Sequence, residues 1–99
     1  MEGQIRRVFG KDADMAIKIS WAENGSRKCD RDNKGLNKDG TYDIGVFMIN
    51  AYYHRHKATD SELRDCLKNI LVAKQIFDRQ GWSPWVVYAN KSYLRYKAN

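Results

Sequence analysis

The chain has 99 residues, of which 42% are hydrophobic and 12% aromatic, and this length fits one small domain. Its apolar content is too high for an intrinsically disordered chain, and no apolar run approaches the roughly 20 residues of a membrane span. The net charge of +6 favours a polyanionic partner, either nucleic acid or an anionic cell wall or membrane surface, without choosing between them.

The N-terminal segment, residues 1–11, is basic. It carries Arg6, Arg7 and Lys11 but has no apolar stretch of the kind that a secretory signal peptide needs. If the protein acts outside the cell, we therefore expect that an export signal was removed, or that release occurs by lysis or as part of a particle.

A first helix is predicted from Ala13 onward, with Asp12 as its N-terminal cap. Apolar residues recur along it at helical spacing and form one stripe: Met15, Ala16, Ile19 and Ala22. Asn24-Gly25 should end this helix, because glycine fits the left-handed conformation past a helix C-terminus.

The middle of the chain predicts a small irregular β or loop region. Residues 26–42 are polar and rich in turn residues, and the pair Asp39-Gly40 is a good signal for a β-hairpin turn. Residues 43–50 are apolar again, but this run is too short for its periodicity to separate a strand from a helix.

Helices are predicted again in the C-terminal half. Thr59 and Glu62 form the capping-box pattern, which opens the clearest helix of the chain. Residues 78–81 should end this helix. Its apolar face comprises Leu63, Leu67, Ile70, Ala73 and Phe77. Ser83-Pro84 then predicts a further short helix with proline at its favoured first position.

Most aromatic residues of the second half lie among apolar neighbours. Core packing is therefore the expected role of Tyr52, Tyr53, Trp82, Trp85 and Tyr88. Aromatic side chains interleaved with Lys and Arg could also stack on bases, but no recognised nucleic-acid-binding signature is present.

Glu23 is the most unusual ionisable residue. It lies four positions after Ile19 and seven after Ala16, on or beside the apolar stripe. It also falls in the last turn of the predicted helix, where the helix dipole disfavours a negative charge. Both effects raise the pKa of a carboxyl, and a carboxylic acid that is protonated near neutral pH can act as a general acid. Periodicity alone leaves open the alternative of an exposed glutamate beside a turn.

Asp43 is the second candidate for chemistry. It follows the hairpin signal and directly precedes Ile44-Gly45. An aspartate near a turn is usually a local hydrogen-bonding residue. However, most glycoside hydrolases use a pair of carboxyl groups that flank the cleft.

The sequence predicts no metal site and no cofactor. Residues 30–35 resemble the start of a calcium loop, but Lys34 occupies its fifth position and Thr41 its twelfth, where a bidentate glutamate is needed. His54 and His56 have no convincingly spaced third ligand. We expect both at the surface, where one of them could line a binding groove.

Four segments, in chain order, resemble the lysozyme superfamily, which joins C-type lysozymes with lytic transglycosylase domains. Residues 16–25 resemble the helix that ends in the catalytic glutamate, and residues 37–50 resemble the motif Asn-x-Asp-Gly-Ser-x-Asp-Tyr/Ile-Gly-x-Phe/Met-Gln-Ile-Asn. Residues 65–74 are similar to the helix that follows, and residues 81–88 to the closing tryptophan segment. The resemblance covers residues 12–95. It implies an α+β, mostly α fold, with residues 1–99 as a single lysozyme-like domain that contains a small β-hairpin region.

The resemblance also implies roles for individual residues. Glu23 matches the family's general acid, and Asp43 matches the second carboxylate of C-type lysozymes. Asn50 matches an asparagine that helps to hold an N-acetyl group, and Tyr53 falls near the sugar-stacking aromatics. Trp85 falls where a tryptophan packs against the acid and raises its pKa, an effect well known from lysozyme itself. The predicted substrate-binding residues are Asn50, Tyr53, Trp85 and Tyr88.

The sequence departs from the family pattern in three ways. Met48 replaces the usual glutamine before the Ile-Asn pair, the β-region is short, and the usual four disulfides are absent. By count alone, Cys29 and Cys66 fit one disulfide or two buried thiols equally well. The family layout brings their two segments together, so the resemblance implies a Cys29–Cys66 bridge and an oxidising, extracytoplasmic site of action.

The resemblance implies an enzyme that cleaves the β-1,4 bond between N-acetylmuramic acid and N-acetylglucosamine. Asp43 favours a glycoside hydrolase of the muramidase type, and a lytic transglycosylase that leaves 1,6-anhydromuramic ends is the alternative. A non-catalytic wall-binding module is an alternative of another class, against which the retained Glu23 argues. Binding to nucleic acid has only charge and aromatic residues in its favour.

We expect the glycan strands of peptidoglycan as the partner, with no nucleic acid and no membrane insertion. We also expect a monomer that acts outside the cell, in the periplasm or in association with phage.

Overall fold

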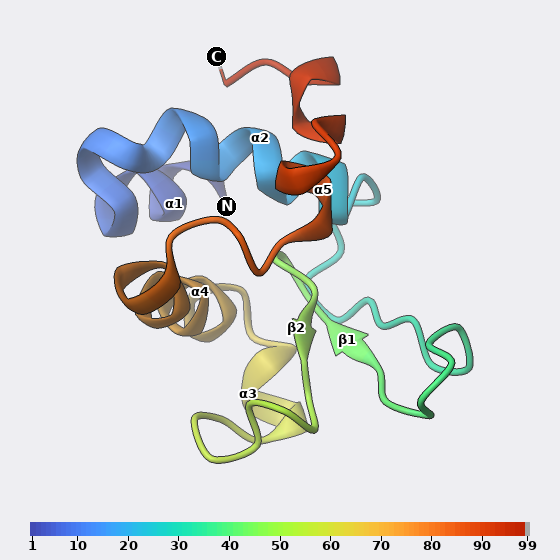
Figure 1. The fold of residues 1–99 in the computed structure, drawn as a ribbon. Coiled ribbons are helices and arrows are strands. Elements are labelled where there is room, and N and C mark those ends of the chain that lie inside the picture. Colours follow the sequence, from blue (N-terminus) through green and yellow to red (C-terminus); the bar gives the residue numbers. More distant parts are fainter. Residues whose placement is uncertain (99) are drawn as a thin grey trace.

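The computed structural model describes residues 1–98. Its elements are helix α1 (Glu2–Phe9), 3₁₀ turn η1 (Gly10–Asp12), α2 (Ala13–Glu23), β1 (Asp43–Ile44), β2 (Ile49–Asn50), α3 (Asp60–Leu63), α4 (Cys66–Gln80), α5 (Val86–Ala89) and 3₁₀ turn η2 (Ser92–Arg95). Helices α1, α2 and α4 gather on one side of the hairpin, and α5 with η2 packs against α2 (Figure 1). The fold is thus mostly α with a small antiparallel sheet, which confirms the predicted fold class.

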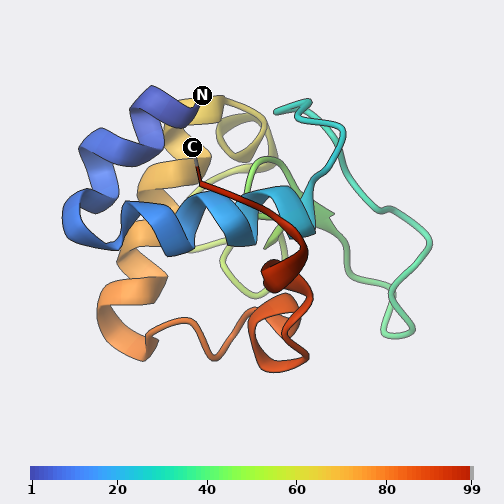
Figure 2. The same ribbon diagram turned by 90° about the horizontal axis from the view of Figure 1, so that it is seen from above.

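The hairpin differs from the prediction in where it turns. Its strands pair Asp43 with Asn50 and Ile44 with Ile49, so the chain reverses over residues 45–48 and not at Asp39-Gly40. The reason is burial: residues 44–47 and 49 are all buried, so the reversal lies inside the protein. Asp39-Gly40 lies instead in a second reversal, between Asp32 and Ile44, which form an isolated antiparallel bridge, so the pair belongs to a turn but not to the turn of the β1–β2 hairpin. The polar loop of residues 26–42 projects away from the helices (Figure 2).

Helix α1 was not predicted, yet it contributes to the core. Ile5 and Phe9 lie four residues apart and are both buried. Phe9 stacks on Trp82, with ring centroids 5.4 Å apart, and contacts Phe47 at 5.6 Å. The largest fully buried side chains come from α1, α2, the hairpin, α3 and α4: Ile5, Ile17, Ile19, Ile44, Phe47, Leu63 and Ile70.

The helix predicted from the capping box is two helices. The capping box of Thr59 and Glu62 is present, but it opens only the short α3. Helix α4 begins at Cys66 with a cap of its own, because the Asp65 side chain accepts a hydrogen bond from the Lys68 N–H. The predicted apolar face is therefore wrong in part: Leu67 is 41% exposed. The buried residues of α4 are Asn69, Ile70, Val72, Ala73 and Ile76.

Other predictions hold to different degrees. Helix α2 begins at Ala13 and ends at Glu23, as expected, although Asp12 makes no side-chain capping bond within residues 1–98.

The short helix predicted at Ser83-Pro84 begins instead at Val86. Trp82 and Trp85 are buried as predicted. The prediction of core packing is wrong for Tyr52 and Tyr53, which are each 55% exposed, and for Tyr88, which is 37% exposed.

A disulfide joins Cys29 to Cys66, as the family resemblance implied, with their Cα atoms 5.1 Å apart. It links the loop that follows α2 to the first residue of α4. Within the part of the chain that the structure describes, no helix combines the length and the apolar character that crossing a membrane requires.

Candidate active site

A cavity of about 840 Å³ lies between the end of α2, the hairpin, the loop around residues 36–41 and the start of α5. Five of the six residues predicted for the site line it: Glu23, Asp43, Asn50, Tyr53 and Trp85. The structure does not bring Tyr88 to this cavity. Its ring stacks instead on Tyr93, with centroids 5.4 Å apart.

Glu23 is the last residue of α2 and is partly buried. Burial raises the pKa of its carboxyl from 4.5 to about 7, because the charged form loses hydration. The negative charge of Asp43 raises the pKa further, and the positive charge of Arg31 opposes the shift. The carboxyl therefore holds its proton up to about neutral pH, which is what a proton donor requires.

The wall of the cavity beside α5 and α4 is apolar. Trp85 is 4% exposed and Ile76 is 3% exposed, and both line the cavity together with Glu23. The indole Nε1 of Trp85 donates a hydrogen bond to the Phe47 carbonyl at 3.1 Å, which fixes the ring against the hairpin. This wall limits the water that reaches the Glu23 carboxyl.

Asn24 holds the end of α2 against the hairpin. Its side chain is fully buried, and its Nδ2 donates to the carbonyls of Lys28 at 2.8 Å and Gly45 at 3.0 Å. Its Oδ1 accepts a hydrogen bond from the Ser26 hydroxyl at 2.6 Å. Because Asn24 directly follows Glu23, these bonds fix the position of the acid relative to the turn. Sequence reasoning treated Asn24 only as a helix stop and missed this role.

Asn69 holds the same turn from α4. Its Oδ1 accepts a hydrogen bond from the Phe47 N–H at 2.9 Å, and its Nδ2 donates to the Ile44 carbonyl at 2.8 Å. Gly45 has a φ of +86°, and a Cβ placed there would lie 2.4 Å from Asn69 Nδ2. The turn is therefore held between two buried asparagines, and the close approach of one of them requires a glycine.

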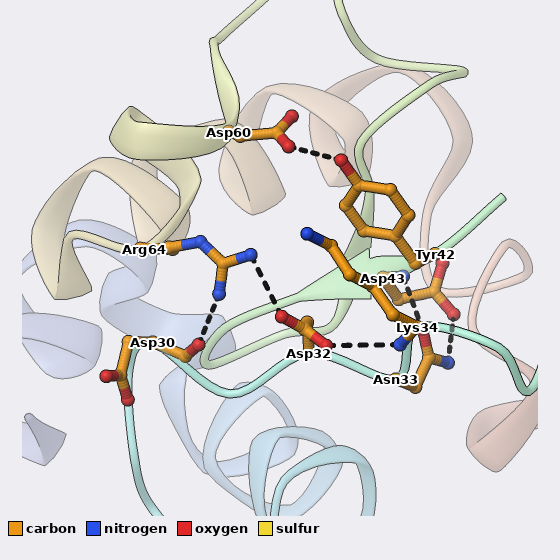
Figure 3. Close-up of polar contacts among 8 residues, drawn as sticks. All are labelled: Asp30, Asp32, Asn33, Lys34, Tyr42, Asp43, Asp60 and Arg64. Carbon is orange, nitrogen blue, oxygen red and sulfur yellow. Dashed lines mark hydrogen bonds and ion pairs between the residues drawn. The ribbon is translucent and has the colours of Figure 1, made fainter.

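Asp43 lies on the opposite, polar wall. Its Oδ2 accepts hydrogen bonds from the side-chain amides of Asn33 at 2.9 Å and Asn37 at 3.3 Å. Its backbone N–H donates to Asn33 Oδ1 at 2.6 Å, so the side chain of Asn33 bonds to Asp43 twice (Figure 3). The loop of residues 30–37 thus fixes the orientation of the second carboxylate.

Asp60 of α3 and Arg64, which directly follows α3, support the polar wall from outside the cavity. Arg64 pairs with the Asp32 carboxylate at 2.9 Å and donates to the Asp30 carbonyl at 2.6 Å, and the Tyr42 hydroxyl donates to the Asp60 carboxylate (Figure 3). The polar wall is therefore supported by charged groups outside the cavity, whereas the apolar wall is supported by the core.

The side-chain amide of Asn50 makes most of its hydrogen bonds within the protein. Its Nδ2 donates to the Thr41 hydroxyl at 2.8 Å, and its Oδ1 accepts the backbone N–H groups of Tyr52 and Tyr53 at 3.1 and 2.9 Å. One Nδ2 hydrogen is left over for a ligand, since this amide nitrogen carries two. Met48, which stands where the family motif has glutamine, lines the cavity beside it.

Tyr53 and His54 also line the cavity. The Tyr53 hydroxyl donates to the Asp39 carboxylate. Burial lowers the pKa of His54, and the nearby Lys57 and His56 add to this effect, so the imidazole is neutral near pH 7. Of the two histidines that the sequence singled out, His54 lines the cavity and His56 is exposed.

The mostly helical fold, the small hairpin and a partly buried glutamate at a helix end are features of a domain of the lysozyme type. A family model described as a lysozyme-like domain matches residues 7–87, and the chain therefore belongs to the lysozyme-like domain family. Membership supports a peptidoglycan-related glycosidase or transglycosylase activity. A search of curated proteins finds no match to the chain.

Proposed function

We propose that this protein is a muramidase, which cleaves the β-1,4 bond between N-acetylmuramic acid and N-acetylglucosamine in peptidoglycan. One observation carries the proposal: the Glu23 carboxyl, with its pKa raised to about 7, shares a cavity with the carboxylate of Asp43. Two carboxyls whose surroundings differ in this way can divide the roles of proton donor and charge stabiliser.

The first step uses Glu23 in its protonated form. The carboxyl donates its proton to the glycosidic oxygen, the bond from that oxygen to C1 of the muramic acid breaks, and N-acetylglucosamine leaves with a free 4-hydroxyl. Positive charge develops on C1 and the ring oxygen, as in an oxocarbenium ion. Glu23 is left as a carboxylate in a poorly hydrated position, from which it can take up a proton in the next step.

In the hydrolytic second step, Asp43 stabilises or captures the sugar cation. Water then adds to C1, its proton passes to Glu23, and the product has a reducing muramic acid end. The hydrogen bonds from Asn33 and Asn37 support the stabilising form of this role, because they hold the carboxylate in one orientation before the charge develops.

The alternative is a lytic transglycosylase. The 6-hydroxyl of the muramic acid attacks C1 in place of water, Glu23 accepts its proton, and a 1,6-anhydro ring forms. One feature of the site favours this alternative: both amide donors bind the same oxygen of Asp43, which withdraws electron density and weakens that oxygen as a nucleophile. The closeness of Asp43 to Glu23 favours the hydrolase, which we retain as the leading proposal.

Digestion of purified peptidoglycan, followed by mass spectrometry of the released fragments, tests the proposal. Reducing muramic acid ends indicate a hydrolase, and ends that are lighter by one water indicate a transglycosylase. Binding to sacculi without release of fragments would indicate a non-catalytic wall-binding module. Salt-sensitive retention on DNA without binding to sacculi would contradict the proposal in both of its forms.

We further propose that the protein acts outside the cytoplasm, in the extracellular space, in the periplasm or as part of a phage. The Cys29–Cys66 disulfide supports this location, because disulfides persist in oxidising compartments. The family's peptidoglycan substrate lies there as well. Comparison of free thiols in the protein isolated from cells and from the culture medium or periplasm tests it.

A further inference from the structure

A second cavity, of about 600 Å³, adjoins the first. The two cavities have Asp39, Thr41 and Tyr53 in common, so Tyr53 stands between them. We name the second one the tyrosine cavity, after the tyrosines among its principal lining residues: Tyr42, Tyr52, Tyr53, Arg55, Asp39 and Asp60. The exposed rings of Tyr52 and Tyr53 meet edge to face, with centroids 5.7 Å apart.

Arg55 is held in this cavity without a carboxylate partner among residues 1–98. Its guanidinium lies over the Tyr52 ring at 4.1 Å, and its Nη1 donates to the Tyr52 carbonyl at 2.7 Å. By contrast, Arg6 and Arg64 are paired with carboxylates. A guanidinium that is fixed and still has free N–H groups can bind a planar carboxylate through two parallel hydrogen bonds.

The same cavity also carries two negative charges. Asp60 accepts the hydroxyl of Tyr42, and Asp39 accepts the hydroxyls of Thr41 and Tyr53. These hydrogen bonds, from Thr41 first and Tyr53 second, lower the pKa of Asp39 to about 2, so it stays charged at neutral pH. The cavity thus offers one free cation and two anions at fixed positions. This arrangement complements a ligand that carries charges of both signs, and a neutral sugar does not use it.

Peptidoglycan carries such a group close to its scissile bond. Short peptides branch from the muramic acid residues, and these stems bear carboxylates and, where a diamino acid is present, an amine. We propose, on the basis of the proposed function, that the tyrosine cavity binds the peptide stem of peptidoglycan. Arg55 then holds a stem carboxylate, and Asp39 and Asp60 face the amine.

The residues that the two cavities share allow the glycan and its peptide stem to bind at the same time, one in each cavity. A glycan that occupies the first cavity places its branches beside Tyr53, from which a stem can enter the second cavity. The tyrosine cavity therefore selects glycan that still carries its peptides over bare glycan, and it acts on binding and leaves the chemical step unchanged.

The test compares intact sacculi with sacculi whose stems have been removed by an amidase, so that the glycan is the same. The variants are Arg55→Ala, Arg55→Lys and, as a control with the same loss of charge, Arg79→Ala in the last turn of α4. Arg55→Ala should raise KM about tenfold on intact sacculi, with kcat unchanged, and should have no effect on stripped sacculi. Arg55→Lys should recover only part of the loss, and Arg79→Ala should match the wild type on both substrates.

An equal effect of Arg55→Ala on both substrates, or no effect on either, would overturn the proposal. A second measurement does not depend on cleavage: NMR titration of the whole protein with the free stem peptide and, separately, with a chito-oligosaccharide. Peptide-induced shifts at Tyr52, Tyr53 and Arg55, lost in Arg55→Ala, support the proposal even if no fragment is ever released. Tyr53 lines both cavities and can shift with either ligand, but shifts of Tyr52 and Arg55 with the oligosaccharide alone would assign the tyrosine cavity to a sugar and overturn the proposal.

Discussion

The two walls of the main cavity carry the same functional group in opposite surroundings. Glu23 lies at a helix end and shares the cavity with the apolar Trp85 and Ile76, and burial raises the pKa of its carboxyl. Asp43 lies in a loop whose amides from Asn33 and Asn37 donate to it. The comparison shows that the chemistry of a carboxyl is set by what surrounds it: burial prepares a proton donor, and hydrogen bonds orient a negative charge.

The largest expected effect is on the cleavage rate, and it comes from replacing the proton-donating carboxyl of Glu23 beside the apolar wall. Glu23→Gln keeps the shape of the side chain but cannot donate a proton, and we expect cleavage of peptidoglycan to fall about 1,000-fold. The rate is measured as fragment release from sacculi. Glu2→Gln, the same substitution outside the cavity, is the matched control and should stay close to the wild type. A fully active Glu23→Gln would remove Glu23 from the mechanism.

Loosening the polar wall should lower stability. The Cys29–Cys66 disulfide closes a loop of 37 residues that contains the whole polar wall, and its removal should reduce the free energy of unfolding by about 4 kcal/mol. Urea unfolding of the oxidised and reduced wild-type protein measures this difference. If reduction leaves the unfolding midpoint unchanged, the disulfide does not support this wall.

The turn that joins the two walls should be nearly as sensitive. Gly45→Ala puts a methyl group 2.4 Å from Asn69 Nδ2 at a residue with positive φ, and we expect a loss of about 3 kcal/mol in the free energy of unfolding. Gly35→Ala is a useful control, because Gly35 also has positive φ but nothing lies near its Cβ. Equal losses in both variants would show that backbone strain, and not contact with Asn69, makes Gly45 necessary.

Stability should depend on pH through Glu23. Its pKa is about 7 in the folded protein and near 4.5 in an unfolded chain, so the stability that the protonated carboxyl contributes is complete below about pH 4.5. It is lost as the pH rises to about 7. Glu23→Gln has no carboxylate to bury, and at pH 8 its free energy of unfolding should exceed that of the wild type by about 3 kcal/mol, with no difference at pH 4. Chemical unfolding at the two pH values measures this, and a difference that does not change with pH would contradict the assigned pKa.

The sequence was informative where one short segment carries the whole signal. Helix α2 was predicted with its correct start and end, and Glu23 stood out because it combines an apolar helix face with a helix end. The disulfide and the gathering of Glu23, Asp43 and Trp85 came from the order of the family motifs, since periodicity has no information on distant contacts.

The sequence was misleading where tertiary contacts decide the local structure. Asp39-Gly40 is a strong turn signal, but the hairpin reverses at the buried residues 45–48, where Asn24 and Asn69 supply the hydrogen bonds. Tyr52 and Tyr53 look like core residues, yet they line the exposed second cavity. No local pattern could show that these two asparagines are buried, because asparagine is usually exposed.

The most direct test of the difference between the two walls is an NMR titration of the Glu23 side-chain carboxyl in the wild type and in Asp43→Asn. The wild type should give a pKa of about 7, and Asp43→Asn should give a lower value that is still above 4.5, because burial contributes more to the shift than the charge of Asp43 does. A wild-type pKa near 4.5 would contradict the assignment of Glu23 as the proton donor.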